Sequence, residues 1–378
     1  MKKRLALWII IIYFAFCGPA LADGEDLGLN CASALLLDGA SGQVLYEQDA
    51  DRKCYPASVT KIMTMVLIME AVDQGTISPD DLVTVSQEAA DMGGSQVYLY
   101  PGEQRTVDEM MVAIAVGSGN DAAYAMAEFV GGTYDGFIDM MNEKAAELGM
   151  VNTHFVNPHG LHDEDHYTTA SDLGKLALYA ADLPGLLDYT SIYEYEFRPE
   201  PNRLTLWNTN RLLKWYQGTI GMKTGYTQEA GRNLVAVAER DGLRLISIVL
   251  GCSERQGHFR ESMDLLNYGF NSFRRKVIYE EGLKIADVPV SKGATDSVEL
   301  VMAKEAGYTC RKNDTAEITK TITVQDCLEA PVCRGDVGGT LTIYKDGQPL
   351  QTVDLVAAAD VDKGGLFRTW KKLLALAL

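Results

Sequence analysis

The sequence is poor in histidine and in positive charge. It has five histidines, and its 34 lysine and arginine residues stand against 52 aspartates and glutamates, giving a formal charge of -18. A chain of this charge repels nucleic acid, so we expect no nucleic-acid partner. No CxxC or histidine-rich spacing suggests a metal site, and we expect neither a metal nor a cofactor. With 378 residues, 47% of them hydrophobic, the chain can form one large domain and a smaller one.

A single apolar run opens the chain, and it is short for a membrane span. The basic residues of "MKKR" precede this run, and Ala20-Leu21-Ala22 follows it as a small-x-small cleavage site. This arrangement is typical of a secretory signal peptide, which we predict over residues 1–22. A first helix retained in the membrane and a lipid on Cys17 are less favoured alternatives. The chain is therefore predicted to be exported.

Seven cysteines are present, and one of them leaves with the predicted signal peptide. The sequence does not choose among the possible pairings of the remaining cysteines, although an exported protein can oxidise them. Cys31 and Cys252 lie at the ends of predicted strands that would be neighbours if the terminal strands pair. A bridge between them is one hypothesis, with Cys54 as an alternative partner. A local bridge among Cys310, Cys327 and Cys333 and free thiols both remain open.

Hydrophobic patterning divides the larger part of the chain into strands, helices and strands again. Residues 32–51 are predicted to form two short strands, residues 58–184 are mostly helical, and residues 233–251 form a buried hairpin. Residues 259–275 are predicted to form a helix. Because strands at both ends bracket a helical middle, we expect the terminal strands to pair in one sheet covered by helices. This α+β domain is predicted over residues 23–276.

The composition changes after residue 276. Short Thr/Val-rich segments separated by turns predict a small β-rich domain over residues 277–362. In residues 363–378, apolar side chains recur at helical spacing on one face, away from Arg368, Lys371 and Lys372. This pattern predicts an amphipathic helix that binds a membrane surface peripherally. The alternative is a helix that docks on the protein.

The stretch "YPASVTKIMTMVL" places Ser58 and Lys61 one helical turn apart. An isolated pair of this kind is usually a capping serine beside a surface lysine. Here the following helix is apolar nearly all round, which indicates an interior helix and a desolvated lysine. Desolvation lowers the pKa of an amine, so a neutral Lys61 could accept the proton of the Ser58 hydroxyl. The Ser58 N–H would lie near a helix N-terminus, where an oxyanion is stabilised.

Two further motifs accompany this pair. Ser118-Gly119-Asn120 interrupts two apolar helices, and Lys223-Thr224-Gly225 lies just before the buried hairpin. The three motifs, in this order, resemble those of serine penicillin-binding enzymes and their β-lactamase relatives. The gaps of about 60 and about 105 residues suit the smaller members of that group.

The resemblance is closer still to the low-molecular-mass D-alanyl-D-alanine carboxypeptidases. The segments that carry it are "PASVTKIMT", "VGSGNDAA", "NPHGL", "MKTGYTQEAGRNLVA" and "LLNYGF". It implies a β-lactamase/transpeptidase-like antiparallel sheet flanked by helices, then a small all-β domain and a C-terminal amphipathic helix. It also implies a location at the outer face of the bacterial cytoplasmic membrane.

The resemblance assigns catalytic roles. Ser58 would attack the carbonyl between the two terminal D-alanines of a peptidoglycan stem pentapeptide, with Lys61 as its base. Ser118 would relay a proton to the leaving amine, and Asn120 would hold Lys61 and the substrate amide. The same serine would react covalently with β-lactam antibiotics, which are the expected inhibitors.

The third motif is expected to bind the substrate. Lys223 would add positive charge beside the cleft, Thr224 would bond the substrate's C-terminal carboxylate, and Gly225 completes the motif. The backbone N–H groups of Ser58 and Tyr226 would form the oxyanion hole.

One position departs from the family pattern. Relatives often carry an arginine seven residues before the "LLNYGF" segment, where this chain has His258. An arginine grips a carboxylate with two hydrogen bonds, and a histidine does not. We therefore take the nearby Arg260 as a candidate substrate-binding residue, with Arg255 as a second basic residue close by. His159 is interpreted as part of a turn, and Cys54 is not expected to be a nucleophile.

Three other functions are alternatives to a carboxypeptidase. A β-lactamase needs fast deacylation, often from a glutamate on a loop after the second motif, and no clear Glu-x-x-x-Asn pattern is present here. A DD-endopeptidase would use the same residues. A catalytically silent wall-binding module should have lost Ser58, Lys61 or Lys223, and all are retained.

Overall fold

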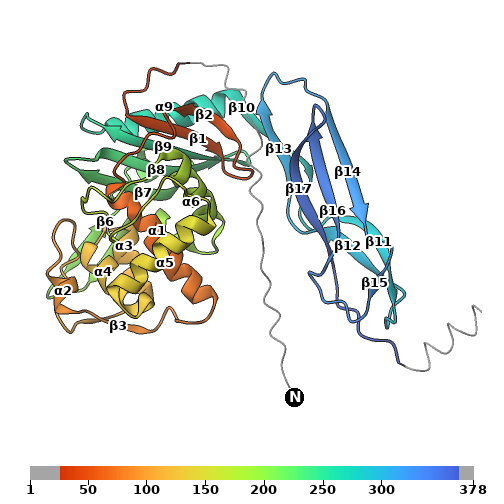
Figure 1. Ribbon diagram of the computed structural model, residues 1–378, viewed down its shortest axis with the longest axis horizontal. Helices are drawn as coiled ribbons and strands as arrows, with labels where there is room; N and C mark the ends of the chain where they lie inside the picture. The colour runs from red at the N-terminus through yellow and green to blue at the C-terminus, as the bar shows by residue number, and fades with distance from the viewer. Residues whose placement is uncertain (1–25, 366–378) are drawn as a thin grey trace, which may run out of the picture.

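The computed structural model describes residues 26–365 as a larger N-terminal unit of mixed helices and strands followed by a β-rich unit (Figure 1). The strands of the first unit are β1 (Ser33–Asp38), β2 (Val44–Gln48), β3 (Leu82–Thr84), β4 (Gln104–Thr106), β5 (Glu194–Arg198), β6 (Leu204–Trp207), β7 (Thr219–Thr227), β8 (Gly231–Arg240) and β9 (Leu243–Cys252). Its helices are η1 (Ala57–Thr60), α1 (Lys61–Asp73), α2 (Gln87–Ala90), α3 (Val107–Ala115), α4 (Asn120–Gly131), α5 (Tyr134–Glu147), α6 (Ala170–Asp182), α7 (Leu186–Ser191), α8 (Leu212–Trp215) and α9 (Gly257–Ser272).

The central sheet has five strands in the order β2-β1-β9-β8-β7, all antiparallel. The first and last strands of the unit are neighbours, with Ser33 opposite Leu250 and Asp38 opposite Leu245. The predicted pairing of the terminal strands in an α+β domain is confirmed. The order leaves β7, which carries the Lys-Thr-Gly motif, at one edge of the sheet.

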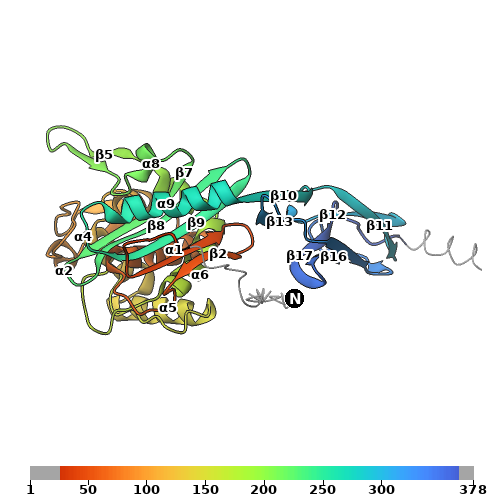
Figure 2. The same ribbon diagram turned by 90° about the horizontal axis from the view of Figure 1, so that it is seen from above.

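Both faces of this sheet are buried, and successive side chains alternate between two cores. Leu35 and Leu37 of β1 belong to the core shared with α1, α3, α4 and α6. Ala34 and Leu36 belong to the core on the opposite face, which α9 covers (Figure 2). Burial on both faces explains why these strands are apolar nearly throughout, without the polar alternation of a half-exposed sheet.

The helix predicted from Ser58 begins differently from the expectation. Residues Ala57–Thr60 form a 3-10 turn, and the α-helix starts at Lys61. The turn packs against β7, because the backbone of Gly225 approaches it closely. Ser58 therefore lies in a tight turn between the apolar helix and the sheet edge.

The second unit consists of strands only among its described residues. These are β10 (Phe273–Tyr279), β11 (Lys284–Ser291), β12 (Ser297–Met302), β13 (Ala306–Arg311), β14 (Ile318–Val324), β15 (Leu328–Glu329), β16 (Val337–Lys345) and β17 (Gln348–Ala357). Six of them form a sheet in the order β14-β16-β17-β12-β11-β15, and β10 pairs with β13. Figure 2 shows β10 leading from the end of α9 into this unit. A small all-β domain after the catalytic domain was predicted, and its presence is confirmed.

Both predicted terminal segments lie largely outside the described residues. This applies to the whole signal peptide over residues 1–22 and to residues 366–378 of the predicted amphipathic helix. The described part of that helix, residues 363–365, is not helical, and Lys363 instead forms a bridge with Gly293. Between residues 26 and 365 no helix is long and apolar enough to cross a membrane.

Candidate active site

Lys61 is the first residue of α1, and its side chain is completely buried. Its Nζ lies 3.1 Å from Ser58 Oγ, 2.6 Å from Asn120 Oδ1 and 2.7 Å from the carbonyl oxygen of His159. The structure thus brings together the serine and lysine of the first motif and the asparagine of the second.

The surroundings of Lys61 favour its neutral form. Burial holds the pKa of the amine well below its usual value, and the positive charge of Lys223 lowers it further. The carboxylate of Asp121 acts in the opposite direction but does not cancel these effects. An uncharged amine in contact with a hydroxyl is the arrangement that a general base requires.

Asn120 is held on three sides at the start of α4. Its Nδ2 donates to the carbonyl of Gly93 over 2.7 Å, which directs Oδ1 toward Lys61. Its backbone N–H donates to the carbonyl of Ser95 over 2.7 Å. The amide orientation is therefore set by the loop that follows α2, not by Lys61 alone.

Lys223 and Ser118 form a second buried pair in the site. Lys223 Nζ donates to Ser118 Oγ over 2.9 Å and to the carbonyl of Thr224 over 3.1 Å. Burial lowers the pKa of Lys223 to about 7. Ser118 has φ of 57°, in the left-handed region that a non-glycine residue rarely adopts. This conformation breaks the helix between α3 and α4 at the residue that contacts Lys223.

The segment 157–161 holds Lys61 through its backbone. Asn157 Oδ1 accepts hydrogen bonds from the N–H groups of His159 and Gly160, and Thr64 Oγ1 donates to the carbonyl of Pro158 over 2.6 Å. These bonds direct the carbonyl of His159 toward the amine. The sequence predicts only a turn here. Every residue type has the same backbone carbonyl, so the sequence does not show which carbonyl contacts Lys61.

The imidazole of His159 supports this turn. Burial is the main cause that lowers the pKa of His159 to about 3, so the ring is neutral. Its Nδ1 accepts a hydrogen bond from the N–H of Leu161 over 3.2 Å. This contact agrees with the structural role that we expected for the side chain.

Ser58 opens onto a cleft of about 280 Å³. Its lining comes from five segments: Ser58, Gly94, Ser95, Asn120, His159, Gly160, Leu161, Tyr226 and Thr227. None of Gly94, Ser95, Gly160, Leu161 and Thr227 was predicted as a site residue. Gly94 and Ser95 lie outside every motif, whereas the other three lie in segments that carry the resemblance but were assigned no individual role. Gly225 brings β7 to this cleft, since a Cβ there would lie 3.0 Å from the Ser58 nitrogen.

His258 and Arg260 both lie on α9, but their side chains have different surroundings. His258 is buried, and burial followed by the charges of Arg232 and Arg211 lowers its pKa to about 4. Arg260 is half exposed and pairs with Glu254 and Glu261, at 2.7 Å and 3.1 Å. It does not line the cleft described above, and its role in substrate binding stays a prediction.

Two other arginines lie closer to the third motif. Arg232 of β8 is opposite Tyr226 of β7, and its guanidinium lies 4.4 Å from the centre of that ring. Arg211 is two residues after Thr209, whose hydroxyl accepts a 2.7 Å hydrogen bond from Thr224. Among the described residues, neither arginine forms an ion pair with an acid.

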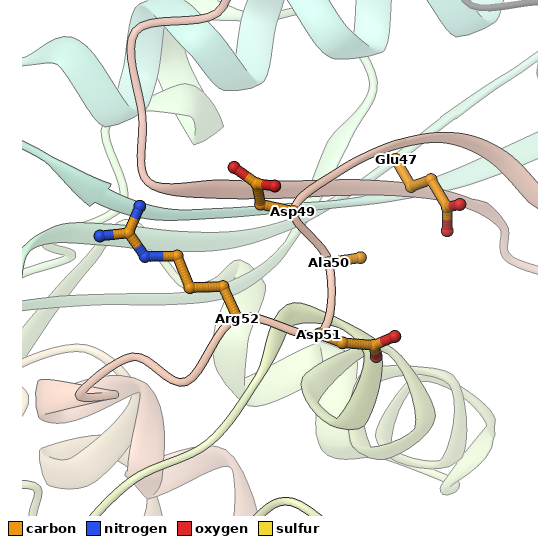
Figure 3. A pocket seen from close by; sticks show the side chains of 5 residues that line it. All are labelled: Glu47, Asp49, Ala50, Asp51 and Arg52. Carbon is orange, nitrogen blue, oxygen red and sulfur yellow. The ribbon is translucent and has the colours of Figure 1, made fainter.

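A second hollow lies just after β2 and is separate from these motifs (Figure 3). Its lining comes from one segment: Glu47, Asp49, Ala50, Asp51 and Arg52. Across residues 26–365, no group of three or more His, Cys, Asp or Glu side chains is arranged to hold a metal ion. The first two motifs meet at the cleft that Ser58 lines, so this cleft is the candidate active site.

Comparison with known proteins agrees with this geometry. Residues 22–254 match the profile of the D-alanyl-D-alanine carboxypeptidase family, and residues 273–363 match that of the C-terminal domain of penicillin-binding protein 5. The chain therefore belongs to the D-alanyl-D-alanine carboxypeptidase family and is an enzyme of the hydrolase class, as its motifs predicted.

Individual relatives cover nearly the whole chain. The D-alanyl-D-alanine carboxypeptidase DacF of Bacillus subtilis (strain 168) is 38% identical over 99% of this chain and 97% of its own length. DacA of Escherichia coli (strain K12) is 34% identical over 97% and 94%. The crystal structure of penicillin-binding protein 5 from Haemophilus influenzae is 32% identical, with a TM-score of 0.70 over 89% of this chain and 98% of that one.

The segment that holds Lys61 provides a test of the site's construction. Gly160 has φ of 86°, and a Cβ there would lie 1.9 Å from the carbonyl oxygen of Ala57, next to Ser58. Gly160→Ala should therefore lower the free energy of unfolding by several kcal/mol, since both the backbone and its neighbour must move.

The matched control is Gly149→Ala, at a residue with φ of 69° and open space around it. It should lower the free energy of unfolding by only about 1 kcal/mol, because the positive φ is unfavourable for alanine but no neighbouring atom has to move. Urea unfolding followed by fluorescence measures both. Equal losses in the two variants would show that the contact with Ala57 does not constrain the segment.

Proposed function

We propose that this chain is a serine-type D-Ala-D-Ala carboxypeptidase that removes the terminal D-alanine from peptidoglycan stem pentapeptides. The observation that carries the proposal is the contact between a fully buried Lys61 and Ser58 Oγ. Family membership and the names of the relatives support the substrate class. The same serine is proposed to react covalently with β-lactams, as the penicillin-binding names of the structural relatives suggest.

The hydrogen bonds of Lys61 suggest how acylation begins. A neutral amine has two N–H donors and one lone pair. If the donors bond Asn120 Oδ1 and the carbonyl of His159, the lone pair is left to accept the Ser58 proton. Ser58 Oγ then attacks the carbonyl between the D-alanines, and its proton passes to Lys61.

Departure of D-alanine requires a proton on its amine. We assign this step to Ser118 as a relay, because its hydroxyl is buried in the site and contacts Lys223. The oxyanion is assigned to the N–H groups of Ser58 and Tyr226, and the contact between Gly225 and Ser58 supports this pairing. Water then hydrolyses the acyl-enzyme and returns Ser58.

We assign the substrate's C-terminal carboxylate to the exposed end of β7. Thr224 and Tyr226 lie on the same face of that strand, and Arg232 is opposite Tyr226. Arg211 is two residues after Thr209, the hydrogen-bond partner of Thr224. Together with Lys223, these arginines would supply the positive charge that His258 does not. Arg260 remains an alternative for this role.

Export and attachment to the membrane complete the proposal. The predicted signal peptide over residues 1–22 and the substrate class both support action outside the cytoplasm. The cationic, apolar pattern of residues 363–378 supports peripheral binding at the outer face of the cytoplasmic membrane.

The proposed activity is tested with a D-Ala-D-Ala-ended pentapeptide and a penicillin, using the full chain. The expected result is release of free D-alanine and a stable penicillin adduct on Ser58, both lost in Ser58→Ala. Ser171→Ala, at a serine outside the cleft, is the matched control and should behave as the unmodified chain.

Three other results would redirect the assignment. A penicillin adduct without D-alanine release would favour an endopeptidase acting on cross-links. Rapid penicillin destruction without D-alanine release would favour a β-lactamase. D-Alanine release that survives Ser58→Ala would contradict the assigned nucleophile.

The carboxylate assignment gives a separate prediction. Arg232→Gln should raise the KM for the pentapeptide about tenfold or more with a smaller change in kcat, because it removes a charge-assisted hydrogen bond to the substrate. Arg260→Gln is the matched comparison, since Arg260 already pairs with Glu254 and Glu261. Steady-state kinetics measures both, and a rise in KM for Arg260→Gln alone would return the role to Arg260.

A further inference from the structure

Two thiols meet where the first and last strands of the central sheet end. Cys31 lies two residues before β1, and Cys252 is the final residue of β9. These strands pair directly, and the N–H of Ala32 donates to the carbonyl of Leu250 over 2.8 Å. In the register of these strands Cys31 stands opposite Cys252, and both belong to the core that α9 covers. All six described cysteines are free thiols in the structure.

The two thiols are not equivalent. Cys31 is partly exposed, whereas Cys252 is completely buried. The neighbouring thiol of Cys252 lowers the pKa of Cys31, and the neighbouring thiol of Cys31 and burial raise the pKa of Cys252. Cys31 is therefore the thiol that forms a thiolate more readily and that an external reagent can reach.

We propose that Cys31 and Cys252 form an intramolecular disulfide by exchange with an external disulfide in the exported protein. The Cys31 thiolate attacks one sulfur of that reagent, giving a mixed disulfide and releasing one thiolate. Cys252 then attacks the Cys31 sulfur and releases the second. The two protein thiols lose two electrons, the external disulfide gains them, and the two thiol protons pass to the released thiolates. The proposal rests on the export of the chain proposed above.

The position of the pair links it to the active site. Next to Cys252, the N–H of Gly251 donates to Asn233 Oδ1 over 2.8 Å. The Nδ2 of Asn233 donates in turn to the carbonyls of Tyr55 and Pro56, over 2.9 Å and 3.0 Å. Those carbonyls lie immediately before the turn that carries Ser58. A bridge at Cys252 would therefore fix the strand end to which this turn is bonded.

The same strand end adjoins the proposed carboxylate site. Cys252 is opposite Arg232 in the β8–β9 ladder. A Cβ on Gly257, the first residue of α9, would lie 3.3 Å from the Cβ of Cys252. The bridge would thus join the segment before β1 to the end of β9, next to the start of α9.

Cys54 is the other candidate partner of Cys31, and the contacts favour Cys252. Cys54 is tied by two backbone hydrogen bonds to Thr168, at 2.8 Å and 2.9 Å. It packs against the core on the helical side of the sheet, whereas Cys31 and Cys252 belong to the core on the α9 side. A bridge between Cys31 and Cys54 would require one of these segments to leave its place.

The proposal is tested on the purified full chain equilibrated with oxidised glutathione and then alkylated. Peptide mass spectrometry should find a cross-link between the peptides of Cys31 and Cys252. The cross-link should persist in Cys54→Ser and be absent in Cys31→Ser. A Cys31–Cys54 cross-link, or unmodified Cys31 and Cys252 thiols in excess oxidised glutathione, would overturn the proposal.

A second measurement compares thermal unfolding of the oxidised and reduced forms. The oxidised form should unfold about 5 °C or more above the reduced form, and this difference should vanish in Cys31→Ser. Equal midpoints in the unmodified chain would contradict a bridge that constrains the sheet. Both readouts are independent of catalysis, so a chain that forms the bridge but releases no D-alanine would contradict only the proposed function.

Discussion

The active site depends on the burial of one amine. Lys61 lies at the start of an apolar helix, so its charged form has lost the water that would stabilise it. An ammonium in such a position is unfavourable unless a carboxylate pairs with it directly, and its three close partners here are a hydroxyl, an amide oxygen and a carbonyl. In the proposed mechanism, the hydrophobic packing of α1 thus supplies a base that an exposed lysine could not provide.

Three separate parts of the fold must come together to supply the partners of Lys61. The 3-10 turn supplies Ser58, α4 supplies Asn120, and the segment 157–161 supplies a carbonyl. Glycines allow the close approaches, with Gly225 against the turn from β7 and Gly160 from the opposite segment. A second buried lysine, Lys223, adds positive charge to the site and further disfavours protonation of Lys61.

Much of this arrangement could be predicted from the sequence. The three motifs are made of side chains, and their order and spacing are distinctive even where each motif alone is weak. The pairing of β1 with β9 followed from apolar segments at both ends of a helical region, which can be buried together only in one sheet. The presence of a separate β domain followed from a change in composition.

The rest of the site could not be predicted from the sequence. It depends on backbone atoms and on the register of paired strands, which residue types alone do not specify. The carbonyls of His159 and Gly93 act through position and would be the same in any residue. Arg260 is close to His258 in sequence and stays a candidate. The register of the β7–β8 hairpin, which the sequence does not specify, places Arg232 opposite Tyr226.

The most direct test of the central claim is the pH dependence of Ser58 acylation at saturating penicillin, where binding no longer limits the rate. Because only the neutral amine can accept the serine proton, the rate should fall as the pH falls through the pKa of Lys61. The account predicts a midpoint well below 10.5, the usual value for lysine. A rate that continues to rise through pH 10.5 would show that Lys61 titrates as an ordinary amine, and it would contradict the account.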